Sequence, residues 1–124
     1  MNVEFETFRE MLAWGKIYAL RIAAAPQRCQ GLIKCEDADV VATLTPSLAS
    51  LGFERTAGLV TGSFCGLFRR NGEDLITSSD PGTGDRSHAF NFGGQSSVSL
   101  RRVLGELALR PGVSVIVDEW TPEL

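Results

Sequence analysis

The segment from Phe90 to Val117 constrains the fold most, because three different residue patterns follow one another along it. The alternation over 87–92 predicts a strand, and a glycine-rich turn leads from it into a helix over 97–109. The apolar residues of that helix recur at helical spacing: Val98, Leu100, Val103, Leu104, Leu107 and Leu109. A Pro-Gly pair then ends the helix, since proline cannot donate a backbone hydrogen bond. The valine-rich run 113–118 predicts a strand with two buried faces.

A strand, a helix and a strand of these lengths predict a right-handed crossover between two parallel strands. In this interpretation strand 113–118 lies directly beside strand 87–92. The glycine-rich turn between strand 87–92 and helix 97–109 then lies at one end of the sheet. The rest of the predicted architecture depends on this placement.

Residues 3–24 predict one long amphipathic helix with a broad apolar face for the core, which includes Trp14. Its charged face is interrupted by a second apolar stripe: Ala13, Ile17, Leu20 and Ala24. Such a stripe is covered either by another part of the chain or by a partner. Because small residues let helices approach closely, the partner can be a second copy of the chain.

The middle of the chain predicts short elements. A connector over 27–31 precedes a short strand at Leu32, and 37–51 forms two helical pieces that restart at Pro46. For 37–45 a strand remains an alternative. Residues 56–79 predict a hairpin, because an Asn71-Gly72 pair favours the positive dihedrals of a tight turn.

Three glycines recur every four residues along the first arm of this hairpin: Gly58, Gly62 and Gly66. Strand glycines are typical of twist or bulging, or of a close approach by a neighbouring group. Together the elements predict a single α+β domain over 1–124. Its mixed, mostly antiparallel sheet contains the hairpin 56–79 and the strands 87–92 and 113–118.

Composition and charge exclude several classes of function. The chain of 124 residues is 44% hydrophobic and 22% charged, as in ordinary globular domains. Its net charge of −3 does not favour nucleic-acid binding, and the charges within 5–25 exclude a membrane span or signal peptide there. The three cysteines (Cys29, Cys35 and Cys65) match no zinc or redox spacing. We therefore expect reduced thiols in a cytoplasmic protein without a metal or cofactor.

A candidate anion site lies at the start of the 97–109 helix and comprises Gly93, Gly94, Ser96, Ser97 and Arg101. The glycines let backbone amides face outward, and the helix dipole adds partial positive charge at this position. The alternative is an ordinary capped turn without a ligand.

A second candidate is nucleophilic catalysis by His88 with Cys65 and Asp85, in which the carboxylate would orient the imidazole. The alternation of strand 87–92 places His88 on the same face as Phe90 and Phe92, which favours a structural histidine. A third candidate is the acidic end of the chain, where Trp120 can contact a basic partner or fold back on the domain.

The order of helices and strands resembles the front part of the acetyl-CoA-dependent N-acetyltransferase superfamily. The corresponding stretch runs from Phe92 to Val98, where the family's backbone amides hold the cofactor pyrophosphate. The family places its glycines further into the turn, with a basic residue or Gln before them. The resemblance implies a phosphate- or acyl-CoA-binding transferase.

The sequence favours a different function. It predicts a small, non-enzymatic interaction protein, inhibitor- or immunity-like, that binds one macromolecular partner. The features behind this prediction are the acidic domain, the second stripe on the first helix and the polar loop over 79–87. The transferase remains the alternative.

Overall fold

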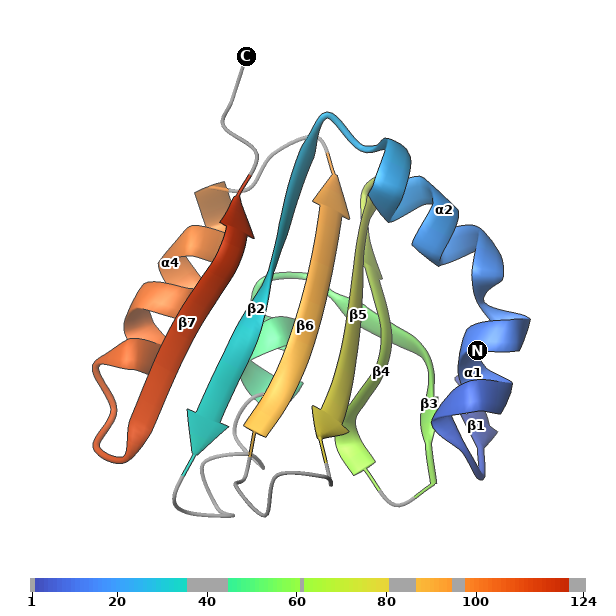
Figure 1. The fold of residues 1–124 in the computed structure, drawn as a ribbon, viewed down its shortest axis with the longest axis horizontal. Coiled ribbons are helices and arrows are strands. Elements are labelled where there is room, and N and C mark those ends of the chain that lie inside the picture. Colours follow the sequence, from blue (N-terminus) through green and yellow to red (C-terminus); the bar gives the residue numbers. More distant parts are fainter. Residues whose placement is uncertain (1, 36–44, 61, 81–86, 95–97, 121–124) are drawn as a thin grey trace.

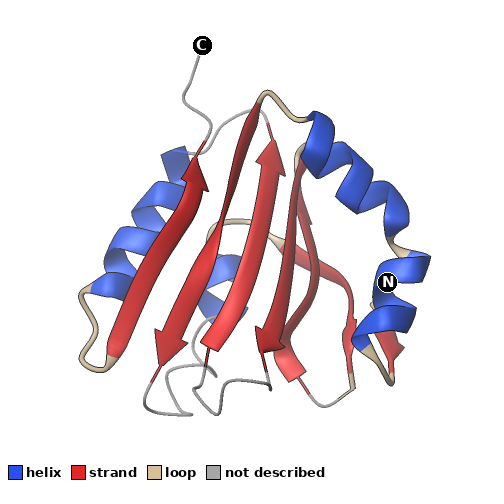
Figure 2. Ribbon diagram, in the orientation of Figure 1, coloured by secondary structure: helices blue, strands red, loops and turns tan. Residues whose placement is uncertain are grey.

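The protein forms a seven-stranded mixed sheet with helices on both faces (Figures 1 and 2). The computed structural model describes residues 2–35, 45–60, 62–80, 87–94 and 98–120. Its elements are β1 (Val3–Phe5), α1 (Phe8–Trp14), α2 (Lys16–Ala24), β2 (Gln27–Cys35), β3 (Glu54–Leu59), β4 (Gly62–Arg70), β5 (Glu73–Asp80), β6 (Ser87–Gly94), α4 (Val98–Ala108) and β7 (Val113–Trp120). A short helix also spans 45–50. The predicted α+β class with a mixed, mostly antiparallel sheet is confirmed.

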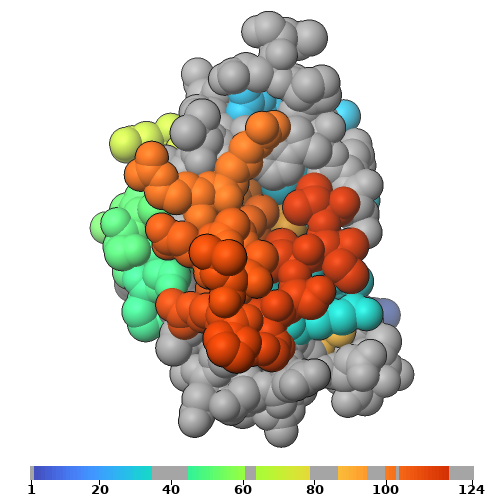
Figure 3. Space-filling model, turned by 90° about the vertical axis from the view of Figure 1, so that its left-hand side faces the viewer, coloured from blue at the N-terminus to red at the C-terminus, as the bar shows by residue number. Residues whose placement is uncertain are grey.

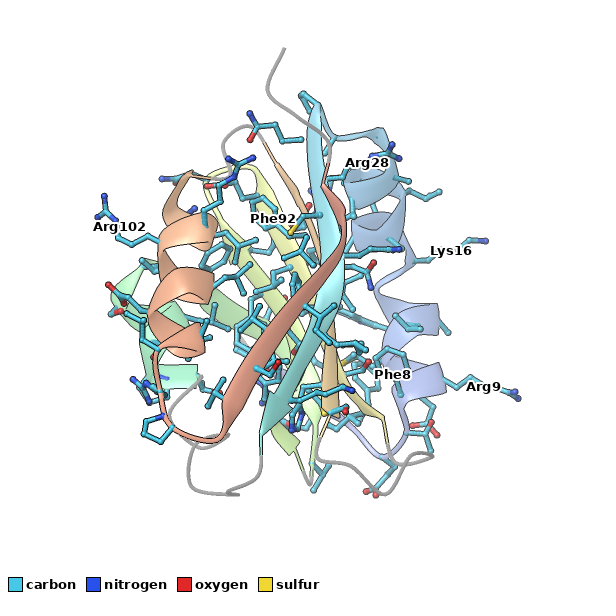
Figure 4. The ribbon with its side chains drawn as sticks, turned by 60° about the vertical axis from the view of Figure 1, so that its left-hand side comes forward. Phe8, Arg9, Lys16, Arg28, Phe92 and Arg102 are labelled. Atoms are coloured by element: carbon cyan, nitrogen blue, oxygen red, sulfur yellow. The ribbon has the colours of Figure 1, made fainter. Side chains whose placement is uncertain are left out.

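Two hydrophobic clusters lie on opposite faces of the sheet. On one face, α4 and the 45–50 helix bury Leu100, Leu104 and Leu48 against strand residues that include Phe92. On the other face, α1 buries Met11 against β3, β4 and β5. Figure 4 shows α4 on one side of the sheet and α1 and α2 on the other. The two faces are called the α4 face and the α1–α2 face below.

The strand order is β1-β3-β4-β5-β6-β2-β7, so β2 separates β6 from β7. The prediction that 113–118 lies directly beside 87–92 is therefore wrong. Both strands pair antiparallel with β2, for example Phe92 with Cys29 and Val115 with Ile33. They run parallel to each other, but with one strand between them. The predicted connector 27–31 belongs to this central strand, since Cys29 and Ile33 alternate into the core.

Gly31 allows β2 to lie between its neighbours. A side-chain carbon at Gly31 would be 2.1 Å from the Ile116 carbonyl oxygen and 2.9 Å from the Phe90 ring. The β2–β7 register also shifts between Gln30 and Gly31, which marks a bulge. Glycine is thus required where the β7 backbone and the Phe90 ring both approach β2.

The predicted N-terminal helix 3–24 is divided in the structure. Residues 3–5 form β1, which pairs parallel with β3, and the helix begins after Thr7, whose hydroxyl accepts a hydrogen bond from the Glu10 amide at 3.2 Å. Gly15 then separates α1 from α2. A side-chain carbon at Gly15 would be 2.3 Å from Leu67 Cδ1, so the chain bends where it touches the sheet.

The predicted hairpin arm 56–69 is two strands, β3 and β4, which pair with each other. The turn at Asn71-Gly72 is confirmed, with φ of 37° and 80°. Gly58 and Gly66 of this arm leave space for the Arg55 side chain, which lies over both. The Arg55 guanidinium donates hydrogen bonds to the carbonyl oxygens of Leu59 and Cys65 and forms an ion pair with Glu4. The close approach is thus made by a side chain of the same protein. Of the predicted pieces in 37–51, the part 37–44 lies outside the described residues.

Candidate functional site

The structure places protein atoms beside the glycines of the predicted anion site. A side-chain carbon at Gly93 would lie 2.6 Å from Ile22 Cα and 3.1 Å from Ala25 Cβ, since α2 packs against β6 here. At Gly94 it would lie 2.6 Å from Glu73 Cγ. Both glycines thus accommodate other parts of the chain.

The remaining residues of the anion site are only partly described. Ser96 and Ser97 lie outside the described residues. Arg101 is exposed on α4. Burial raises the pKa of the Cys29 thiol to about 12, and the positive charge of Arg101 partly opposes this rise. The anion site stays a prediction.

His88 and Cys65 lie on opposite faces of the sheet. His88 lies on the α4 face with Phe90 and Phe92, because every second residue of β6 faces the same side. Its ring meets the Phe64 ring edge-on, with 5.5 Å between the ring centres. Cys65 follows Phe64 in β4 and therefore faces the other side. Burial lowers the pKa of His88, and Nδ1 has no hydrogen-bond partner within the described part of the chain. The structure does not bring this thiol and this imidazole together, and Asp85 lies outside the described residues.

The second apolar stripe of the N-terminal helix is exposed. Ala13 is exposed, and Ile17 and Leu20 are each 56% exposed on α2. Trp14 joins them at 48% exposure, with its ring stacked on Tyr18 at 6.1 Å. These four residues are called the helix stripe below.

Trp14 was assigned to the core face by a pattern that assumes one continuous helix. The helix breaks at Gly15, directly after Trp14, and the Trp14 ring lies half exposed beside Phe5 and Tyr18, at 5.7 Å and 6.1 Å between ring centres. The glycine inside an otherwise periodic run was the signal for this break. The Trp120 side chain, the other predicted partner contact, lies outside what the structure describes.

A buried ion pair fixes α2 to the sheet. The Asp74 side chain is 3% exposed, and its two oxygens lie 3.2 Å from Arg21 Nε of α2 and 3.2 Å from Arg69 Nε of β4. Both guanidinium groups also lie over the Tyr18 ring, at 4.7 Å and 5.5 Å from its centre. These contacts hold the helix stripe in a defined position.

A groove of about 440 Å³ runs between α1–α2 and the sheet. Its helical wall is apolar and includes Phe8, Leu12 and the small residues Ala19 and Ala23, which leave space beside the sheet. Its floor is more polar and carries Gln30, Ser78 and Asn91 from three neighbouring strands. Figure 4 shows Phe8 pointing toward the sheet, whereas Arg9 and Lys16 point away from it. The sequence did not predict this groove, because β2 was not recognised as a central strand.

Among the residues described, no cluster of three His, Cys, Asp or Glu side chains can hold a metal ion. None of the described helices is long and apolar enough to cross a bilayer. Comparisons with protein-family models, with curated proteins and with solved structures find no match.

Proposed function

We propose that this protein is a non-enzymatic interaction protein that binds one macromolecular partner, a protein, through the helix stripe. The observation that carries the proposal is the exposure of Trp14, Ile17 and Leu20 on a helix pair that is anchored to the sheet. Tryptophan and large aliphatic side chains on a rigid surface are typical of binding hot spots.

The surroundings of the stripe suit a protein partner. Charged residues lie beside it on α1 and α2, among them Arg9, Glu10 and Lys16, which are exposed. An apolar centre with a polar rim is the usual anatomy of such an interface. The two thiols that the structure describes, Cys29 and Cys65, are buried, and neither is in a disulfide bond with another described residue. They agree with the expected cytoplasmic location, which forms part of the proposal.

The test is a comparison of two glutamate variants. In Ile17→Glu/Leu20→Glu a charge enters the centre of the stripe, and we expect at least a tenfold loss of partner affinity, since hot-spot residues contribute about 2 kcal/mol or more each. Leu109→Glu is the matched control, because Leu109 is 85% exposed and follows α4 on the other side of the sheet.

The partner is identified by crosslinking in cells and then purified, and its affinity for all three proteins is measured by calorimetry. Urea unfolding of the same proteins shows that a loss of affinity is not a loss of the fold. Equal affinity of wild type and Ile17→Glu/Leu20→Glu for the partner would refute the proposal. Light scattering of the same proteins shows whether the stripe contacts a second copy of the chain instead.

A further inference from the structure

The groove between the helix pair and the sheet carries two carboxamides side by side on its floor. Gln30 of β2 pairs directly with Asn91 of β6, and Asn91 in turn pairs with Ile76 of β5. Because Ile76 belongs to the cluster under α1, all three side chains lie on the α1–α2 face. Side chains directly opposite each other in such pairs begin about 5 Å apart, so one ligand group can reach both carboxamides.

One cation lies at the end of this floor. Arg28 precedes Gln30 by two residues in β2 and therefore faces the same side of the sheet. Its Nη1 donates a hydrogen bond to the Ala23 carbonyl oxygen at 3.2 Å, which holds the guanidinium beside the end of α2. A guanidinium carries five N–H donors in a planar fork, so it can bind Ala23 and a carboxylate together. Among the described lining residues Arg28 is the one with a charge.

The helical wall of the groove is apolar and extends away from this cation. Figure 4 shows Arg28 near one end of the helix pair and Phe8 near the other, on the same side of the sheet. Figure 3, which looks at the sheet from the β7 edge, shows β2 (cyan) at the surface beside β7. Since Arg28 and Gln30 of β2 are exposed, a ligand can enter the groove from the β2 side. From Arg28 toward the far end, the wall includes Ala23, Ala19, Leu12 and Phe8.

These features restrict the chemistry of the ligand. A polyanion such as a nucleotide requires several cations and a cationic ligand requires a carboxylate, whereas the described lining offers one guanidinium and no acid. A wholly apolar ligand would bury the carboxamides of Gln30 and Asn91 without partners, which costs free energy. The ligand that satisfies the whole lining has one carboxylate, one amide and an apolar body.

We propose that the groove binds an N-acylated amino acid, in which an acyl chain, an amide and a carboxylate follow one another. The carboxylate pairs with Arg28, and the acyl chain lies along the helical wall toward Phe8. The amide exchanges hydrogen bonds with Gln30 and Asn91, since each carboxamide has both donors and an acceptor. The groove volume of about 440 Å³ is typical of small-molecule sites.

The first test measures the binding of N-decanoylglycine by calorimetry, below the concentration at which it forms micelles. We expect Arg28→Gln to weaken binding at least tenfold, because the charge-assisted hydrogen bonds to the carboxylate are lost. We expect the same variant to bind decanoylglycinamide, which has no carboxylate, as wild type does. Lys34→Gln is the matched control, because Lys34 is an exposed cation on the same face of β2 but outside the described lining.

Wild type that shows no saturable binding of N-decanoylglycine at millimolar concentration would overturn the proposal. Equal losses of affinity in Arg28→Gln and Lys34→Gln would also overturn it. Ile17→Glu/Leu20→Glu changes the helix stripe and leaves the groove lining intact, and we expect it to bind N-decanoylglycine as wild type does. The ligand site and the partner site are thus tested separately.

The second test fills the groove. Ala23→Phe places a ring between α2 and the floor, and we expect it to abolish binding. Ala24→Phe places the same ring on the next residue of α2, which is exposed and outside the described lining, and we expect unchanged affinity. Urea unfolding verifies that both variants keep the fold. Equal affinities of the two variants would show that the ligand does not occupy the groove.

The third test addresses the amide. Asn91→Leu removes one carboxamide at nearly constant size, and we expect the affinity for N-decanoylglycine to fall about fivefold, the effect of one hydrogen bond. Decanoate has the chain and the carboxylate but no amide, and we expect its affinity to be unchanged. Equal losses for the two probes would overturn the assignment of the ligand as an N-acylated amino acid.

Discussion

At the scale of single residues, His88 shows how burial turns a candidate catalytic group into a structural one. The imidazole lies on the α4 face with Phe64 at its side and Nδ1 unpartnered among the described residues. Its environment favours the neutral ring, because a charged imidazolium loses hydration on burial.

The lowered pKa of His88 predicts a loss of stability in acid. The unfolded chain takes up a proton near the ordinary pKa of 6.5, whereas the folded chain does so only at lower pH. The unfolded state therefore binds more protons as the pH falls below about 6.5, and the free energy of unfolding decreases through that range. Urea unfolding on either side of pH 6.5 measures this effect.

His88→Leu replaces the imidazole with an apolar side chain of similar size that does not titrate. We expect its stability to depend less on pH than that of wild type between neutral pH and the onset of carboxylate titration. Parallel pH dependences in the two proteins would show that His88 does not contribute.

Gly31 gives a second prediction at this scale. Alanine there meets the Ile116 carbonyl oxygen at 2.1 Å, so we expect Gly31→Ala to destabilise the fold by about 1–3 kcal/mol or more. Gly105→Ala is the same substitution at an exposed position of α4, where an added side-chain carbon meets nothing within 4 Å, and we expect it to stabilise by about 1 kcal/mol. Urea unfolding of both variants is the measurement. Equal effects would mean that the close approach at Gly31 is not a constraint.

At the scale of elements, the sequence predicted what local chemistry determines. The helix 97–109 and the Asn71-Gly72 turn follow from periodicity and from backbone dihedrals, and both are present. The predicted helix 3–24 contains two helices and a strand, because contacts with the sheet override local periodicity at Phe5 and Gly15.

The attachment of α2 gives the prediction at this scale. Asp74→Asn removes the charge that binds Arg21 and Arg69, and we expect a loss of about 1–3 kcal/mol, the range for buried charged hydrogen bonds. Because both arginines are about 40% exposed, the lower half of that range is expected. Hydrogen exchange should accelerate in α2 more than in β2. Glu106→Gln on exposed α4 is the control, and a uniform acceleration in both elements would contradict the anchoring role.

At the scale of the whole molecule, the class of the fold was predictable and the order of its strands was not. Alternation along 87–92 and 113–118 identifies two strands, but no local pattern says that a third one separates them. Residues 27–31 contain a single apolar side chain, Cys29, so the sequence pattern predicts a connector where the central strand lies. Helical spacing predicts Ala13, Ile17 and Leu20 of the helix stripe, whereas it places Trp14 in the core. The groove could not be predicted, because it depends on the neighbours of β2.

The position of β2 in the sheet also limits when its strand pairs can form during synthesis. Synthesis delivers β2 well before either of its neighbours, β6 and β7. The nascent β2 therefore has neither neighbouring strand until β6 and β7 have been made, and such long-range pairing is slow. During that interval the unpaired β2 is exposed to aggregation with other chains.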